Sequence, residues 1–213
     1  MTKPNLSLII VILDRSGSMA SCRSDMEGGL NTFLEDQKKE PGECRLTFIQ
    51  FDTTYETLAD YIDLKDAPHF TLEPRGNTAL YDAMGRTITA VGAKLASLPE
   101  EERPSNVAVC IVTDGQENAS VEWTSERIAR LVKQQSEQWG WNFTYLGANQ
   151  TAINEAGLIG IQPHTSLTYN ASSAQAVATS YAAMSHSVST LRRTGAMPGY
   201  TSQTREDALR KTD

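Results

Sequence analysis

The sequence is poor in the residues on which several classes of protein depend. Only three cysteines occur among its 213 residues, Cys22, Cys44 and Cys110, and no two of them form a Cys-x-x-Cys pair. An odd number of scattered cysteines argues against a disulfide framework, and their spacing does not indicate a zinc site. We therefore expect three free thiols, each buried in the fold.

Positive charge and long apolar segments are scarce as well. The formal net charge is -7 and the pI is near 5.0, so the chain lacks the basic surface that contact with nucleic acid requires. The longest apolar run, Leu8 to Leu13, is too short to span a bilayer, and the first residues lack the features of a signal peptide. We expect a cytoplasmic protein that binds neither nucleic acid nor a membrane.

The first half of the chain alternates between strand and helix patterns. Residues Leu6 to Leu13 are almost continuously apolar and rich in Ile and Val, which predicts a central strand buried on both faces of a sheet. Apolar residues at helical spacing predict a helix from about Met19 to Lys39. The runs Arg45 to Phe51 and Tyr55 to Ile62 are too close together for a parallel crossover, so they predict a hairpin and one antiparallel edge strand.

The alternation continues through the second half. A helix is predicted to begin after Thr78, which stands where a cap would, and to end at Pro99. The later patterns predict a strand at Val107 to Val112, a helix at about Glu126 to Trp139, a strand at Trp141 to Leu146, a short helix at Gln150 to Ala156, a short strand at Ser166 to Tyr169 and a helix at about Ser172 to Leu191. The sequence therefore predicts an α/β fold with a doubly wound, mostly parallel central sheet, one antiparallel edge strand and helices on both faces.

The last segment has a different composition. Residues 192–213 are rich in Gly, Pro, Ser, Thr and charge and hold few large apolar groups, so burial cannot offset the entropy lost on ordering them. We predict one domain over residues 1–191, followed by a mobile polar tail over residues 192–213. An arm that engages another copy or a partner is the alternative.

Polar side chains gather where the predicted strands end. The first strand leads into Asp14, Ser16 and Ser18, the second buried strand leads into Asp114, and Thr78 precedes a helix. Open α/β sheets bind ligands at the carboxyl edge of their strands. Few carboxylates with several hydroxyls suit Mg²⁺, for which Mn²⁺ should substitute. The sequence therefore predicts a metal site at this edge.

These residues resemble the metal-ion-dependent adhesion site of the von Willebrand factor A-type family. That site reads Asp-x-Ser-x-Ser, a distant Thr, and a distant Asp commonly followed by Gly, and all three parts occur here in order. The stretch from Gly76 to Ala83, which opens a helix, is also similar to the family. The resemblance covers about residues 5 to 190 and implies a Rossmann-like fold; we further expect a bacterial or phage source.

The resemblance also implies a function. Ser16, Ser18 and Thr78 would contact the metal through hydroxyls, and Asp14 and Asp114 would bind it directly or through water. An Asp or Glu of a protein partner would fill the open coordination position, which makes the chain a Mg²⁺-dependent protein-protein interaction module and not an enzyme.

Two other functions remain open. One is a Mg²⁺-dependent enzyme of phosphoryl transfer or hydrolysis, although the sequence lacks a phosphate-binding Gly-x-x-x-x-Gly-Lys loop, a Gly-x-Ser-x-Gly elbow and a His-Glu-x-x-His motif. The other is a structural or assembly subunit in which the metal only braces the loops.

Neighbours of the candidate ligands receive two further predictions. Asp82, in the first helical turn after Thr78, is expected to support the structure near the helix dipole. The polar residues beside the ligands are expected to surround the open position, and two roles are open for each of them: shaping the choice of partner, or forming solvated surface. They are Arg15, Arg75, Asn77, Gln116, Glu117 and Asn118.

Overall fold

A six-stranded sheet runs through the computed structural model, which describes residues 2–148 and 152–211. The strand order is β3-β2-β1-β4-β5-β6, and only β3 runs antiparallel to its neighbour. The strands are β1 (Lys3–Asp14), β2 (Glu43–Phe51), β3 (Tyr55–Asp63), β4 (Pro104–Thr113), β5 (Asn142–Gly147) and β6 (Ser166–Thr168). The predicted mostly parallel sheet with one antiparallel edge strand is confirmed.

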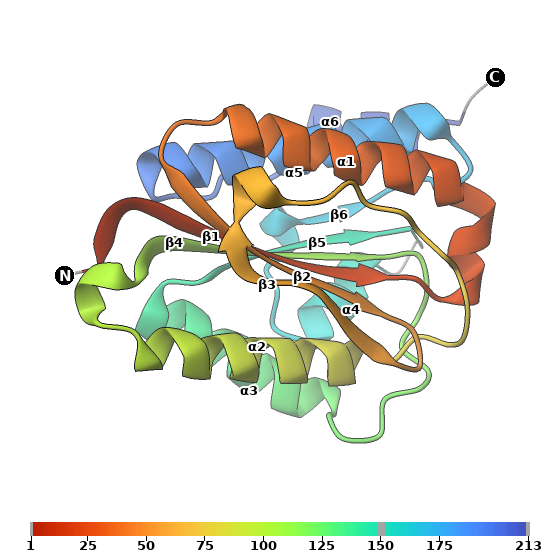
Figure 1. Ribbon diagram of the computed structural model, residues 1–213. Coiled ribbons are helices and arrows are strands. Elements are labelled where there is room, and N and C mark those ends of the chain that lie inside the picture. Colours follow the sequence, from red (N-terminus) through yellow and green to blue (C-terminus); the bar gives the residue numbers. More distant parts are fainter. Residues whose placement is uncertain (1, 149–151, 212–213) are drawn as a thin grey trace.

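Helices cover both faces of this sheet (Figure 1). They are α1 (Arg23–Lys39), α2 (Leu80–Ser97), α3 (Ser125–Trp139), α4 (Ala152–Leu158), α5 (Ala174–Thr194) and α6 (Ser202–Leu209). Helices α1 and α5 lie on one face, and α2 and α3 lie on the other. None of the helices in the described parts of the chain is both long and apolar enough to cross a membrane.

Strand β1 lies at the centre because both of its faces are apolar. Ile9, Val11 and Leu13 pack into the hydrophobic cluster beneath α1 and α5. The alternating residues Ile10 and Ile12 pack into the second cluster, beneath α2 and α3. All five side chains are fully buried, as expected for a strand flanked by parallel neighbours and covered on both sides.

The register of the sheet sets where the polar residues meet. Asp14 pairs with Phe51 of β2, and Leu13 pairs with Val112 of β4. The carboxyl ends of β1, β2 and β4 therefore lie at one edge, on the right in Figure 1.

The helix predicted from about Met19 begins in a different form. Residues Gly17–Cys22 form a 3₁₀ helix, and the α-helix starts only at Arg23, after Cys22 leaves helical geometry with φ -124° and ψ 17°. The short helix predicted at Gln150 to Ala156 corresponds to α4; its first two predicted positions fall outside the described residues.

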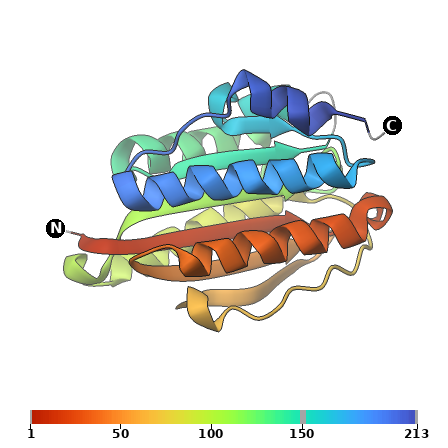
Figure 2. The same ribbon diagram turned by 90° about the horizontal axis from the view of Figure 1, so that it is seen from above.

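The prediction of a mobile tail over residues 192–213 is wrong for the part that the structure describes. Helix α5 continues to Thr194 and ends at Gly195, whose φ of +77° is the left-handed geometry that glycine adopts without strain. Helix α6 follows and lies beside α5 and β6 (Figure 2). Thr201 caps α6 by accepting a hydrogen bond from the N–H of Thr204.

A few well-placed contacts order this polar segment. Tyr200 is 8% exposed and its hydroxyl lies 2.5 Å from the Thr144 hydroxyl, while its N–H donates to His164 O. Ala208 is fully buried. Arg205 donates to the carbonyl of Ser166 at 2.8 Å. The segment holds few large apolar groups, but one buried tyrosine and these polar contacts to the main chain order it.

Candidate metal site

Three loops converge at the carboxyl edge of the sheet. The loop after β1 brings Asp14 and Ser18, the loop after β4 brings Asp114 and Gly115, and Thr78 immediately precedes the first residues of α2. A Cβ atom placed on Gly115 would lie 2.9 Å from Thr78 Oγ1, 3.6 Å from Asp14 Oδ2 and 3.6 Å from Ser18 Oγ. The glycine thus borders a small polar space that a larger side chain would fill.

Hydrogen bonds connect four of the five predicted ligands. Ser18 Oγ donates to Asp114 Oδ1 at 2.7 Å and lies 3.1 Å from Ser16 Oγ. The N–H of Ser16 donates to Asp14 Oδ1 at 2.6 Å. Thr78 Oγ1 borders the same position beside Gly115 as Asp14 and Ser18, so the structure brings together all five side chains that the sequence singled out.

The pKa values of the two carboxyl groups, Asp14 and Asp114, are both raised. Asp14 is fully buried, and burial raises its pKa to about 6, although hydrogen bonds from Thr113 and Ser16 oppose the shift. The nearby charge of Asp114 adds to the increase. Burial also raises the pKa of Asp114. A cation between the two groups would relieve the cost of burying both negative charges.

The chemistry of these donors fits a hard divalent cation. They are carboxylate and hydroxyl oxygens, without nitrogen or sulfur, and oxygen ligands are those that Mg²⁺ and Mn²⁺ prefer. No cluster of three or more His, Cys, Asp or Glu that could hold a metal occurs among residues 2–148 and 152–211. A metal ion at this place would therefore need the hydroxyls of Ser16, Ser18 and Thr78 as ligands.

Thr78 is positioned by the loop after β4 and not by capping a helix. The N-cap of α2 is Ala79, so the predicted cap is wrong by one residue. Asn118 Oδ1 accepts from Thr78 N at 3.0 Å, and Thr78 O accepts from the N–H groups of Asn118 and Ala119. Because the main chain of Thr78 is held on both sides, its hydroxyl is fixed next to Gly115.

Arg15 does not surround the open position as predicted. It is 4% exposed, and its Nε donates to Asp52 Oδ2 at 2.9 Å while Nη1 donates to Gln50 and Glu56. These partners lie on β2, β3 and the turn between them, so the guanidinium points away from the candidate ligands. Arg75 Nε also donates to Asp52 Oδ2, at 2.9 Å.

Asp52 is a structural residue that the sequence reasoning missed. Burial would raise its pKa, but hydrogen bonds from Thr54, Arg75 and Arg15 outweigh that effect and lower it. Its carbonyl also accepts from Ala79 N at 3.2 Å. Asp52 therefore ties the loop after β1 to the start of α2. Its position in the sequence could have indicated this role, because Asp52 directly follows a buried strand that ends at the same edge of the sheet as Asp14.

Two acidic side chains hold the loop between β4 and α3. Asp82, as predicted, supports the structure: its carboxylate accepts from the N–H groups of residues 121, 122 and 123 at 2.8 to 2.9 Å. Glu117 accepts from the N–H groups of Tyr81, Ala119 and Ser120. Glu117 and Asn118 are thus occupied within the loop, and of the six predicted surrounding residues Asn77 and Gln116 are exposed without such roles.

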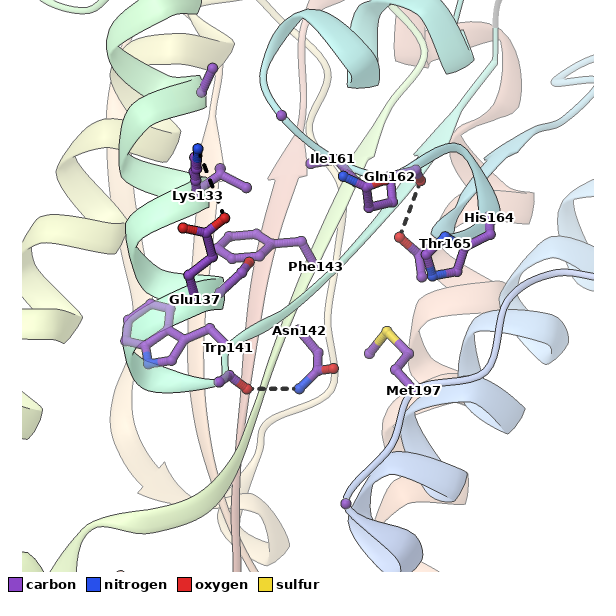
Figure 3. A pocket seen from close by; sticks show the side chains of 16 residues that line it. Lys133, Glu137, Trp141, Asn142, Phe143, Ile161, Gln162, His164, Thr165 and Met197 are labelled. Carbon is purple, nitrogen blue, oxygen red and sulfur yellow. Dashed lines mark hydrogen bonds and ion pairs between the residues drawn. The ribbon is translucent and has the colours of Figure 1, made fainter.

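A cavity of about 760 Å³ lies elsewhere, beside the amino end of β5 (Figure 3). Polar side chains around it are paired with their neighbours: Lys133 with Glu137 at 3.9 Å, Asn142 with the Gly140 carbonyl at 2.9 Å, and Thr165 with the Gln162 carbonyl. None of the five candidate ligands lines it. The cavity is therefore separate from the candidate metal site.

Comparison with known proteins identifies the fold. No family model and no curated protein matches the chain. Among solved structures, proximal thread matrix protein 1 from the mussel byssus matches with a TM-score of 0.63 and 17% identity over 89% of this chain and 46% of that one. This chain therefore spans less than half the length of the mussel protein.

Two bacterial structures match equally well. The pilus adhesin SpaC from Lactobacillus rhamnosus GG has a TM-score of 0.63 and 15% identity over 88% of this chain and 30% of its own. The vWF domain of the pilus tip protein Mfa5 from Porphyromonas gingivalis has a TM-score of 0.62 and 11% identity over 95% of this chain and 99% of its own. At such low identity these likenesses establish the fold and not the function.

Proposed function

We propose that this chain, which has the fold of von Willebrand factor A-type domains, is a Mg²⁺-dependent protein-protein interaction module. Asp14, Ser16, Ser18, Thr78 and Asp114 would hold the metal. When bound, the ion supplies an open coordination position that an Asp or Glu carboxylate of a protein partner fills. Mn²⁺ should substitute, because it accepts the same oxygen ligands.

The convergence around Gly115 is the observation that carries the proposal. Side chains from three loops face one space, and burial raises the pKa of both carboxyl groups there, Asp14 and the partly buried Asp114. Only these two carboxylates balance the charge of a divalent ion, and the remaining ligands are neutral hydroxyls. Because only two carboxylates of this chain would lie near the ion, the carboxylate of a partner can approach it as a third anionic ligand.

Proteins with the same fold support both halves of the proposal. One structure of the mussel byssus protein carries a zinc-occupied metal-ion-dependent adhesion site, at a TM-score of 0.56 and 20% identity. SpaC is named as an adhesin. A zinc-occupied adhesion site and an adhesin thus both occur among proteins with this fold. The choice of Mg²⁺ and of a carboxylate partner is our proposal for this chain.

Catalysis is the alternative that we do not favour. None of the three histidines of the chain makes a hydrogen bond to a candidate ligand within the described residues. Incubating the protein with Mg²⁺ and nucleotides or phosphoesters tests this directly. Hydrolysis that is lost in Asp14→Ala would replace our proposal with an enzymatic function.

The cytoplasm is the compartment that we propose. Cys22, Cys44 and Cys110 are all buried and unpaired, which suits a reducing environment and is not the pattern of a disulfide-stabilised secreted domain. Fractionation of cells that produce the full-length protein tests the location; recovery outside the cytoplasm would contradict it.

The decisive experiment for function is affinity capture with three protein variants. Immobilised wild type is incubated with lysate in Mg²⁺ or in EDTA, next to Asp14→Ala and a matched control, Asp25→Ala, which changes an acid in the first turn of α1. We expect a partner that is retained by wild type and Asp25→Ala only in Mg²⁺. A partner that all three variants retain in EDTA would instead favour a structural subunit in which the metal braces the loops.

A further inference from the structure

A second polar cavity lies at the end of the molecule opposite the candidate metal site. It has a volume of about 380 Å³ and is bordered by the start of β1, the end of α1, the segment after β3 and the end of α5. Figure 1 shows the ends of α1 and α5 side by side there. Three cationic side chains line it: Lys38, Lys65 and Arg192.

Arg192 is the unusual member of this set. It is 9% exposed, yet no carboxylate lies within ion-pair distance of it among the described residues. Its Nη1 donates to Gln37 O at 2.6 Å and to Gln37 Oε1 at 3.2 Å, and its Nη2 donates to Pro41 O at 3.4 Å. Its Nε is buried without a partner and is too enclosed for a solute to reach, whereas Nη2 uses only one of its two N–H groups. Buried charges are normally paired, so this cation has capacity left for an anion.

The acidic side chains at the cavity are already occupied. Glu40 pairs with Arg193 at 3.1 Å, and Glu43 pairs with Lys3 at 2.8 Å. Asp63 accepts from the N–H of Lys65 at 3.0 Å. Glu40 and Glu43 are thus paired with cations outside the cavity, and the charge of Asp63 offsets only one of the two cations, Arg192 and Lys65, that have no carboxylate partner.

The two lysines at the cavity differ in whether they have an anionic partner. Lys38 Nζ contacts Glu35 at 2.8 Å and the Ala67 carbonyl at 3.1 Å. Lys65 is exposed, and its Nζ has no partner within the described part of the chain. Arg192 and Lys65 are therefore the two cations at this cavity without an anionic partner.

We propose that this cavity binds an oxyanion, the phosphate or carboxylate group of a small molecule, through Arg192 and Lys65. A guanidinium and an ammonium form strong charge-assisted hydrogen bonds with such oxygens. The bound anion would supply the negative charge that buried Arg192 lacks. It would also strengthen the junction at which Arg192 joins the end of α5 to the end of α1.

Thermal unfolding in EDTA tests the site without involving the metal ligands. Inorganic phosphate and acetate are titrated separately at constant ionic strength against wild type, Arg192→Met and Lys65→Ala. Lys133→Ala is the matched control, because Lys133 is an exposed lysine on α3. For millimolar binding we expect 20 mM of the preferred anion to raise the Tm of wild type and the control by about 4 °C, and to raise that of both cavity variants by less than half as much.

Each outcome decides the proposal. A larger shift with phosphate assigns a phosphate site, and an equal or larger shift with acetate assigns a carboxylate site. Equal shifts in wild type, the control and Lys65→Ala would show a general salt effect and overturn the proposal, as would a wild type that neither anion stabilises. Lys65→Ala keeps the test valid if Arg192→Met does not fold, because Lys65 is exposed.

Discussion

Replacing Asp14 with asparagine should stabilise the metal-free protein. Burial raises the pKa of Asp14 from 3.8 to about 6, a difference of roughly 2 pKa units that corresponds to about 3 kcal/mol for keeping the group ionised at neutral pH. Asparagine has almost the same shape and carries no charge. We therefore expect Asp14→Asn to raise the free energy of unfolding by about 1–3 kcal/mol at pH 7.5 in EDTA.

The local hydrogen bonds allow this substitution. The N–H of Ser16 can still donate to Oδ1, which it approaches to 2.6 Å. Thr113 Oγ1 now donates to Asp14 Oδ2 at 2.6 Å but also lies 3.1 Å from the Gly115 carbonyl. Its hydroxyl can turn to that carbonyl and accept from one of the two N–H groups of the new side-chain amide.

The pH dependence follows from the direction of the shift. Because the folded state binds the Asp14 proton more tightly than the unfolded state, wild-type stability from this group is full below pH 3.8 and is lost as pH rises through about 6. The advantage of Asp14→Asn should therefore be present at pH 7.5 and absent near pH 3.8. Urea unfolding followed by circular dichroism in EDTA at both pH values measures it. A variant that is less stable at pH 7.5, or equally changed at both pH values, would refute the reasoning.

Three further substitutions and one thiol-labelling experiment test other parts of the structure. Asp52→Ala should lower the free energy of unfolding by about 1–3 kcal/mol, measured with urea, because buried Arg15 loses its buried partner at 2.9 Å and keeps only the half-exposed Glu56. A loss below about 0.5 kcal/mol would contradict the role given to Asp52. Tyr200→Ala should lower the free energy of unfolding by about 3 kcal/mol, since Tyr200 is 8% exposed. Leu209→Ala should lower it by less than about 0.5 kcal/mol, since Leu209 is 50% exposed. Equal effects of the two substitutions would support the prediction of a mobile tail. Burial raises the pKa of the Cys44 thiol to about 11, so Ellman's reagent at pH 8 should react with it only after urea is added, and rapid native labelling would show an accessible thiolate.

Patterns that repeat along the chain predicted the fold well. The continuous apolar runs of β1 and β4 identified the central strands, because a strand covered on both faces contains almost no polar residues. The three-residue gap between β2 and β3 identified the antiparallel edge. The geometry of the helix starts was not predictable, since Ala79 and not Thr78 is the N-cap of α2, a choice made by hydrogen bonds from a loop 40 residues away in sequence.

The sequence predicted the candidate ligands of the site but not the residues that hold the surrounding loops in place. Asp14, Ser18 and Asp114 could be grouped because parallel strands end at one edge, and the structure places them together. Arg15 stands between two of these residues in the sequence but points to β2 and β3, because buried Asp52 and half-exposed Glu56 offer carboxylates there. Such pairings depend on residues 37 and 41 positions away, which one sequence without a structure does not reveal.

Calorimetric titration of Mg²⁺ into the metal-free protein tests the central claim most directly, with Asp14→Asn and the matched Asp25→Ala run under the same conditions at pH 7.5. We expect one ion to bind per chain in wild type and in Asp25→Ala, with no saturable binding in Asp14→Asn despite its intact fold. Wild type that binds no divalent ion, or Asp14→Asn that binds it equally, would contradict the assignment of Asp14, Ser16, Ser18, Thr78 and Asp114 as a metal site.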